Sequence, residues 1–75
     1  MIKILFTWHA LEKLTERKIT KQMVTATINT PSKLISDAEK FYAFRKFGRK
    51  YLKVIFVRGE SEVKIITQHF IDFLP

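Results

Sequence analysis

The chain has 75 residues, no cysteine, and 14 Lys and Arg against 7 Asp and Glu, so its formal net charge is +7. This length predicts one domain, residues 1–75, and the lack of cysteine excludes disulfides and thiolate metal sites. No apolar run approaches the roughly 18 residues of a membrane span, and the start lacks a signal-peptide pattern, so we expect a cytoplasmic protein without a membrane partner.

A short apolar strand over residues 2–6 begins the chain, and a helix follows it. Thr7 is suited to be the N-cap, because its hydroxyl can accept a backbone N–H of the first turn. Trp8, Leu11 and Leu14 recur every three residues, which predicts a face that packs on the core. We therefore interpret Trp8 as a core residue rather than as a base-stacking side chain.

A second helix is predicted between Thr20, again a suitable N-cap, and the segment Asn29-Thr30-Pro31. The residue before a proline disfavours the α region, so the helix should end there. Its inner face is expected to hold Met23, Val24, Thr27 and Ile28.

After Pro31 the residue types favour strands. Leu34-Ile35 suits a short strand, and three stronger strands are predicted over residues 41–47, 51–58 and 62–70. The turns between these three are short, which favours an antiparallel meander. The predicted fold class is α+β, with two N-terminal helices, after a short first strand, packed on an antiparallel β-meander of three to four strands.

The stretch Lys40–Arg58 concentrates half of the basic residues of the chain and contains no acidic one. Aromatic residues alternate with these charges, and Gly48 marks a turn, so we predict a hairpin with one buried and one basic, aromatic face. Such a surface is typical of nucleic-acid binders, whereas the plainer interpretation is a solvated basic hairpin. The basic residues are Lys40, Arg45, Lys46, Arg49, Lys50, Lys53 and Arg58.

Period two assigns the side chains of residues 51–58 to two faces of the predicted sheet. Leu52, Val54 and Phe56 form the purely apolar set and should face the helices, so Tyr51 and Lys53 should face away. If the turns pair Phe47 with Tyr51 and Val57 with Val63, two rows of side chains cross three strands on the outer face. The expected rows are Arg45–Lys53–Thr67 and Phe47–Tyr51–His69.

The first of these rows offers two cations and a hydroxyl to a phosphate, and phosphoryl transfer needs mainly such positioning and charge. His9 and His69 are candidate general acids or bases, and His9 lies in the first turn of a helix, where an anion is stabilised. The plainer interpretations are phosphate binding without chemistry, surface charge, and histidines that only pack or face solvent. No carboxylate cluster accompanies the histidines, so no metal site and no cofactor is predicted.

The segment Thr7–Ile19 matches the pattern T-x-H-A-x-x-x-[LM]-x-x-R-x-I and is followed by a helix that ends in Asn29-Thr30-Pro31. Phe47-Gly48 with Leu52-Lys53-Val54, and Ile65-Ile66-Thr67, match two further short patterns. With these motifs, nearly the whole chain resembles the domain of unknown function 4258 family. One departure is that a glycine usually follows the motif arginine in that family, whereas here Lys18 follows Arg17.

The resemblance extends to small RNase folds that include the RelE-type toxins of toxin–antitoxin systems. It implies two helices on an antiparallel sheet whose other face meets RNA, with a site built from a helix histidine, basic sheet residues and a polar residue near the last strand. By resemblance these roles would fall on His9, Arg17, Arg45, Lys53, Thr67 and His69.

We therefore expect an RNA-binding, toxin-like endoribonuclease domain that cleaves phosphodiesters without a metal. A non-catalytic nucleic-acid-binding module, and a small interaction protein whose basic face docks an acidic antitoxin-like partner, remain open as alternatives. A homodimer would help so small a core. The expected catalytic residues are His9, Arg45, Lys53, Thr67 and His69, and the expected nucleic-acid-binding residues are Arg17, Lys46, Arg49, Lys50 and Tyr51.

Overall fold

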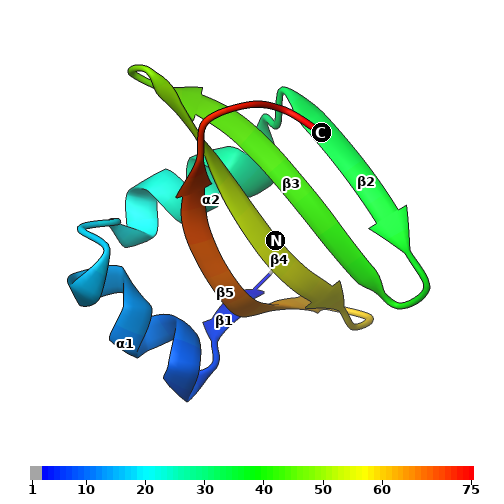
Figure 1. Ribbon diagram of the computed structural model, residues 1–75. Coiled ribbons are helices and arrows are strands. Elements are labelled where there is room, and N and C mark those ends of the chain that lie inside the picture. Colours follow the sequence, from blue (N-terminus) through cyan, green and yellow to red (C-terminus); the bar gives the residue numbers. More distant parts are fainter. Residues whose placement is uncertain (1–2) are drawn as a thin grey trace.

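The computed structural model, which describes residues 3–75, places two helices on one face of a five-stranded sheet and leaves the other face open (Figure 1). The α+β class and the two N-terminal helices are as predicted. Ile2, the first residue of the predicted N-terminal strand, lies outside the described residues. The elements are β1 Lys3–Phe6, α1 Trp8–Glu16, α2 Lys21–Asn29, β2 Lys33–Asp37, β3 Lys40–Phe47, β4 Lys50–Arg58 and β5 Glu62–Ile71.

The sheet is mixed, with the strand order β1-β5-β4-β3-β2, so the predicted meander of three to four strands is too small. Strands β2 to β5 do form an antiparallel meander, but β1 joins its far edge in parallel to β5, with Lys3 opposite Glu62. Hydrophobic periodicity predicted the strand segments, but it carries no information on which distant strands pair.

Helix α1 begins and ends with local hydrogen bonds that its sequence encodes. The Thr7 hydroxyl accepts the Ala10 N–H, as an N-cap does. At the other end the N–H groups of Lys18 and Ile19 donate to the carbonyls of Thr15 and Leu14. This is the Schellman arrangement, and it places Lys18 in the left-handed region with φ +56°.

Trp8 is 77% exposed, so its predicted place in the core is wrong. Ala10 and Leu14 are the buried residues of α1 and define the side that faces the sheet. Because each residue turns the helix by about 100°, Trp8 lies about 200° away from Ala10 around the axis. The spacing of Trp8 and Leu11 correctly predicted a helix, but the buried face of that helix is centred on Ala10 and Leu14.

Helix α2 carries its predicted inner face toward the sheet. Thr20 caps its start by accepting the Met23 N–H, and Val24 and Thr27 are fully buried. The core cluster joins both helices to β3, β4 and β5 and comprises Ala10, Leu14, Ile19, Val24, Ala43, Leu52, Val54, Phe56, Val63 and Ile65.

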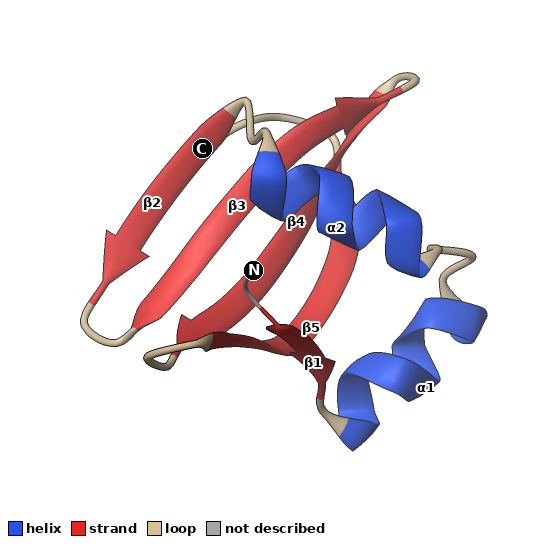
Figure 2. Ribbon diagram, turned by 180° about the vertical axis from the view of Figure 1, so that it is seen from behind, coloured by secondary structure: helices blue, strands red, loops and turns tan. Residues whose placement is uncertain are grey.

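The two helices do not cover the whole sheet. Helix α1 packs on β5 and β1, and α2 packs on β4 and β3, while β2 extends past the helix layer (Figure 2). Leu34, on the helix-facing side of β2, is accordingly 52% exposed.

Candidate nucleic-acid interface

The turn between β3 and β4 decides which side chains of β3 face away from the helices. Phe47 pairs with Lys50, so the loop is the two residues Gly48-Arg49, and Gly48 takes φ +67°. The predicted pairing of Phe47 with Tyr51 is therefore wrong by one residue, and a slip of one residue exchanges the two faces of a strand. Tyr42, Phe44 and Lys46 face the open side of the sheet.

The turn between β4 and β5 is also shifted relative to the prediction. Arg58, not Val57, lies opposite Val63, and a bulge between Ile55 and Phe56 changes the register again. Lys53 consequently faces His69, and Ile55 faces Thr67. The two expected rows, Arg45–Lys53–Thr67 and Phe47–Tyr51–His69, do not form.

Arg45 lies on the helix-facing side of β3, opposite the buried Leu52. Its guanidinium donates to the carbonyl of Ala26, at 3.3 Å, and to the hydroxyl of Thr30. A cation at this position stabilises the carbonyl end of α2. The geometry thus gives Arg45 a structural contact and separates it from Lys53, with which we had grouped it.

Four polar side chains gather on the open face near the edge formed by β5, and we call them the open-face cluster: Arg17, Lys53, Thr67 and His69. Lys53 and His69 are direct cross-strand partners. Arg17, just after α1, reaches over the edge and donates to the Thr67 hydroxyl at 3.4 Å and to the Gln68 carbonyl at 2.8 Å. Helix α1 and two strands therefore supply the cluster together.

The positive charge of the open-face cluster acts on its histidine. Partial burial lowers the pKa of His69 below its ordinary value of 6.5, and the charges of Lys53 and Arg17 lower it further. The imidazole is therefore neutral at pH 7, and it is a proton acceptor held in a positive field. A field of this sign also favours the binding of a phosphate.

Aromatic rings lie beside this cluster. The Lys53 ammonium is 5.3 Å from the centre of the Tyr42 ring and 6.0 Å from that of Phe44. Tyr51 and Lys46 are a cross-strand pair further along the same face, toward the hairpin loop. Tyr42 was not among the predicted site residues, because the wrong register placed it on the helix side. The sequence does contain a signal for the correct register, since a two-residue loop that begins with glycine is typical of a tight hairpin turn.

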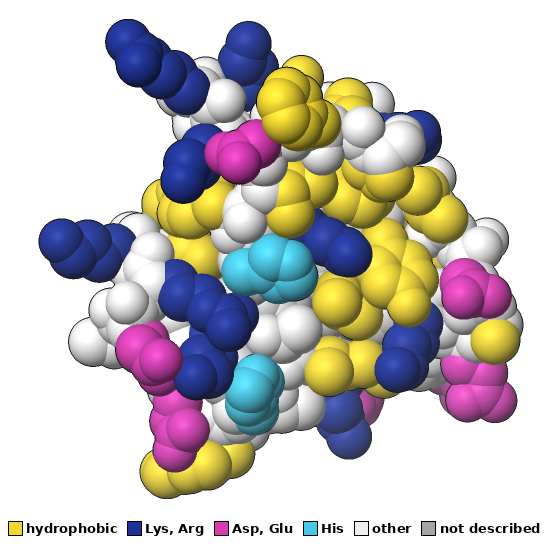
Figure 3. Space-filling view, viewed as in Figure 1, with side chains coloured by type: hydrophobic (Ala, Val, Ile, Leu, Met, Phe, Trp, Pro, Cys, Tyr) yellow, Lys and Arg dark blue, Asp and Glu magenta, His cyan; other side chains and the backbone are white. Residues whose placement is uncertain are grey.

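The other predicted residues lie around this face or away from it. His9 is exposed in the first turn of α1. Figure 3 shows both histidine side chains on the same face of the molecule, with Lys or Arg side chains beside them. Arg49 is in the hairpin loop, and Lys50, opposite Phe47, points to the helix side at the end of the sheet.

The C-terminal segment, residues 72–75, crosses the open face from the end of β5 toward β2 (Figure 1). Lys33 of β2 donates a hydrogen bond to the carbonyl of Pro75. Phe44, the cross-strand partner of Lys33, is 1% exposed although it points to this face. The C-terminal segment thus covers Phe44, whereas Tyr42, Lys53 and Ile55 on the same face remain partly exposed.

Residues 3–75 contain neither a cluster of metal ligands nor a membrane-spanning helix. No three His, Asp or Glu side chains in that range come together as metal ligands. No helix in the same range has the length and apolar character required to cross a membrane.

Comparison with known proteins identifies the family. Searches of curated proteins and of solved structures found no significant match. The family model described as "Domain of unknown function (DUF4258)" matches residues 6–67, which include both helices, the complete strands β2, β3 and β4, and most of the open-face cluster. The chain therefore belongs to the DUF4258 family.

Proposed function

We propose that this protein binds single-stranded RNA on the open face of its sheet and cleaves it, without a metal, at the open-face cluster. The observation that supports this most directly is the pairing of Lys53 with His69 beside Arg17 and Thr67. These groups supply a neutral base, two cations and a hydroxyl within one small area of an exposed surface.

Binding follows from the charge and the rings of this face. The Lys53 ammonium and the free N–H groups of Arg17 can contact phosphate oxygens, while Tyr42 and Tyr51 offer ring surface to bases. The open face of a sheet suits an extended strand of nucleic acid better than a duplex.

These groups are sufficient for the cleavage of RNA, because the 2′-hydroxyl of RNA is an internal nucleophile. His69 takes the proton of the 2′-hydroxyl, and the 2′-oxygen then forms a bond to phosphorus. The bond between phosphorus and the 5′-oxygen breaks, and that oxygen takes up a proton from water or from His9. The products are a 2′,3′-cyclic phosphate and a 5′-hydroxyl, and the cations stabilise the charge that develops on the phosphate.

The experiment uses a labelled single-stranded RNA in EDTA and compares the wild type with His69→Ala. We expect the variant to cleave about 10²–10⁴-fold more slowly while its RNA affinity is largely kept. An RNA with 2′-deoxy residues should bind and stay intact. His9→Ala in the same assay decides whether His9 supplies the second proton.

Binding is measured separately by the salt dependence of RNA affinity. Lys53→Ala should lower the slope of log K against log salt by about 0.7. Lys64→Ala is the matched control, since Lys64 is exposed on the same sheet but lies opposite Val57, outside the open-face cluster. No RNA affinity at low salt would refute the whole proposal.

The alternatives give different results in these assays. Salt-dependent binding with no cleavage would support a non-catalytic RNA-binding module instead, and cleavage that His69→Ala does not slow would refute the role of His69 as the base. Binding of an acidic protein in place of RNA, blocked by Lys53→Ala, would support the interaction protein.

A further inference from the structure

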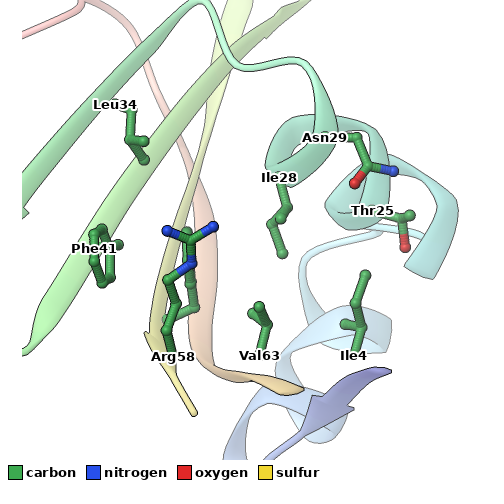
Figure 4. Close-up of a pocket in the computed structure, with 9 residues that line it drawn as sticks. Ile4, Thr25, Ile28, Asn29, Leu34, Phe41, Arg58 and Val63 are labelled. Atoms are coloured by element: carbon green, nitrogen blue, oxygen red, sulfur yellow. The ribbon is translucent and has the colours of Figure 1, made fainter. Parts of the chain in front are cut away.

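A hollow lies on the helix-facing side of the sheet, away from the open-face cluster. It has a volume of about 510 Å³ and lies between α2 and the sheet, with side chains from all five strands in its lining (Figure 4). Most of its lining is apolar, and we call it the groove, defined by Ile28, Leu34, Phe41, Phe56, Arg58 and Val63. A volume of several hundred Å³ with an apolar lining and few polar groups is typical of binding sites.

Arg58 is the charged group of this groove. Its guanidinium lies 5.4 Å from the centre of the Phe41 ring, and Figure 4 shows it projecting into the space between Phe41 and Ile28. No acidic residue lines the groove, and within residues 3–75 the one ion pair is Lys13–Glu16. The guanidinium is thus held against a ring with its donors available, in a form suited to a carboxylate.

The helix layer also has room at this place. Neighbouring strands are about 4.8 Å apart and a helix is about 10 Å wide, so one helix covers roughly two strands. Helices α1 and α2 cover β1, β5, β4 and β3, which leaves β2 and the half-exposed Leu34 uncovered. The uncovered width is about one strand, so a further helix beside α2 would rest on β2 and extend past the edge of the sheet.

We propose that the groove docks an acidic amphipathic helix of a partner protein. The apolar stripe of that helix packs on Leu34 and Phe41, and a Glu or Asp at the border of the stripe pairs with Arg58. Charge supports this occupant: the net charge of the chain is +7, and the groove presents a cation and no anion. The inference does not depend on the proposed function, because the groove lies on the opposite side of the sheet.

The test is selection from a display library of helical peptides, about 18 residues long and randomised along one face, against the wild-type protein. Selected peptides should carry a carboxylate beside apolar residues at i, i+3, i+4 and i+7. Arg58→Ala and Leu34→Ser should each weaken their binding about tenfold. Lys64→Ala, which removes one charge from the open face, should leave the affinity unchanged.

The role of the ion pair is tested by changing the selected Glu of the peptide to Gln. This change should cost as much affinity as Arg58→Ala, and the two together should cost little more than either one alone. Backbone amide NMR shifts on binding should concentrate at β2, β3 and the end of α2. No selected peptide, peptides without a carboxylate, equal binding to Arg58→Ala, or shifts on the open face would each overturn the proposal.

Discussion

Lys18 occupies a backbone position that penalises any residue with a Cβ atom. Its φ of +56° is required by the Schellman bonds that end α1, and its side chain is exposed. The left-handed region costs an L-residue about 1–2 kcal/mol, and glycine avoids that cost but loses about 0.4–1 kcal/mol through its freer unfolded chain. We therefore expect Lys18→Gly to stabilise the protein by about 0.5–1 kcal/mol.

For a domain of this size such a gain raises the melting temperature by about 2–8 °C, which calorimetry or circular dichroism resolves. Lys18→Ala is the matched control: it removes the same charge but keeps the Cβ atom, so its melting temperature should stay near that of the wild type. Gln22→Gly, at an exposed position in the first turn of α2, should instead destabilise by about 0.4–1 kcal/mol, because glycine gives the unfolded chain more freedom.

If Lys18→Gly lowered the melting temperature, or if Lys18→Ala raised it equally, the backbone argument would be refuted. The left-handed φ that the C-terminus of α1 requires at Lys18 is also a physical reason for a glycine to follow the motif arginine, as the family pattern has it.

Three other expectations can be measured on the purified protein. Leu52→Ala should cost about 2–5 kcal/mol of unfolding free energy, because Leu52 is fully buried, and Lys53→Ala much less; the reverse order in thermal melts would contradict the face assignment of β4. The pKa of His69, followed by NMR, should lie below its ordinary value of 6.5 and rise in Lys53→Ala but not in Lys64→Ala; an unchanged pKa in Lys53→Ala would contradict the coupling. Because the pKa of His69 is lower in the folded state, the unfolded chain binds the proton first, so the stability of the protein should fall as the pH drops below 6.5. His69→Gln should lose this contribution to the pH dependence of stability, and identical pH profiles of the two proteins would contradict the coupling.

The sequence predicted the features of this fold that depend on neighbouring residues. Thr7 and Thr20 cap the two helices as expected, because a cap needs only the hydroxyl and the first turn that follows it. The buried face of β4 was also predicted correctly, since Leu52, Val54 and Phe56 are alternate apolar residues of one strand.

The features that the sequence analysis missed depend on the length of a turn or on the pairing of strands that are far apart in the sequence. The loop at Gly48 is one residue shorter than expected, so Arg45 faces the helices and Tyr42 faces the open side of the sheet. The shifted turn between β4 and β5 and the bulge near Ile55 each change the register by one residue, so His69, rather than Thr67, lies opposite Lys53. The expected rows and the family resemblance grouped Lys53, Thr67 and His69, but their arrangement depends on the register of β4 and β5, which no local pattern encodes.

The short length of β1 has a consequence for how the molecule avoids aggregation. Strand β1 pairs with β5 only as far as Ile65, so the rest of β5 is an edge, and unpaired edges recruit strands from other molecules. The Thr7 hydroxyl donates to the Ile66 carbonyl and Arg17 to the Gln68 carbonyl, so two side chains occupy acceptors that an incoming strand would use. Arg17 thus protects this edge in addition to its place in the open-face cluster, and a variant that lacks it would expose a template for intermolecular β-pairing.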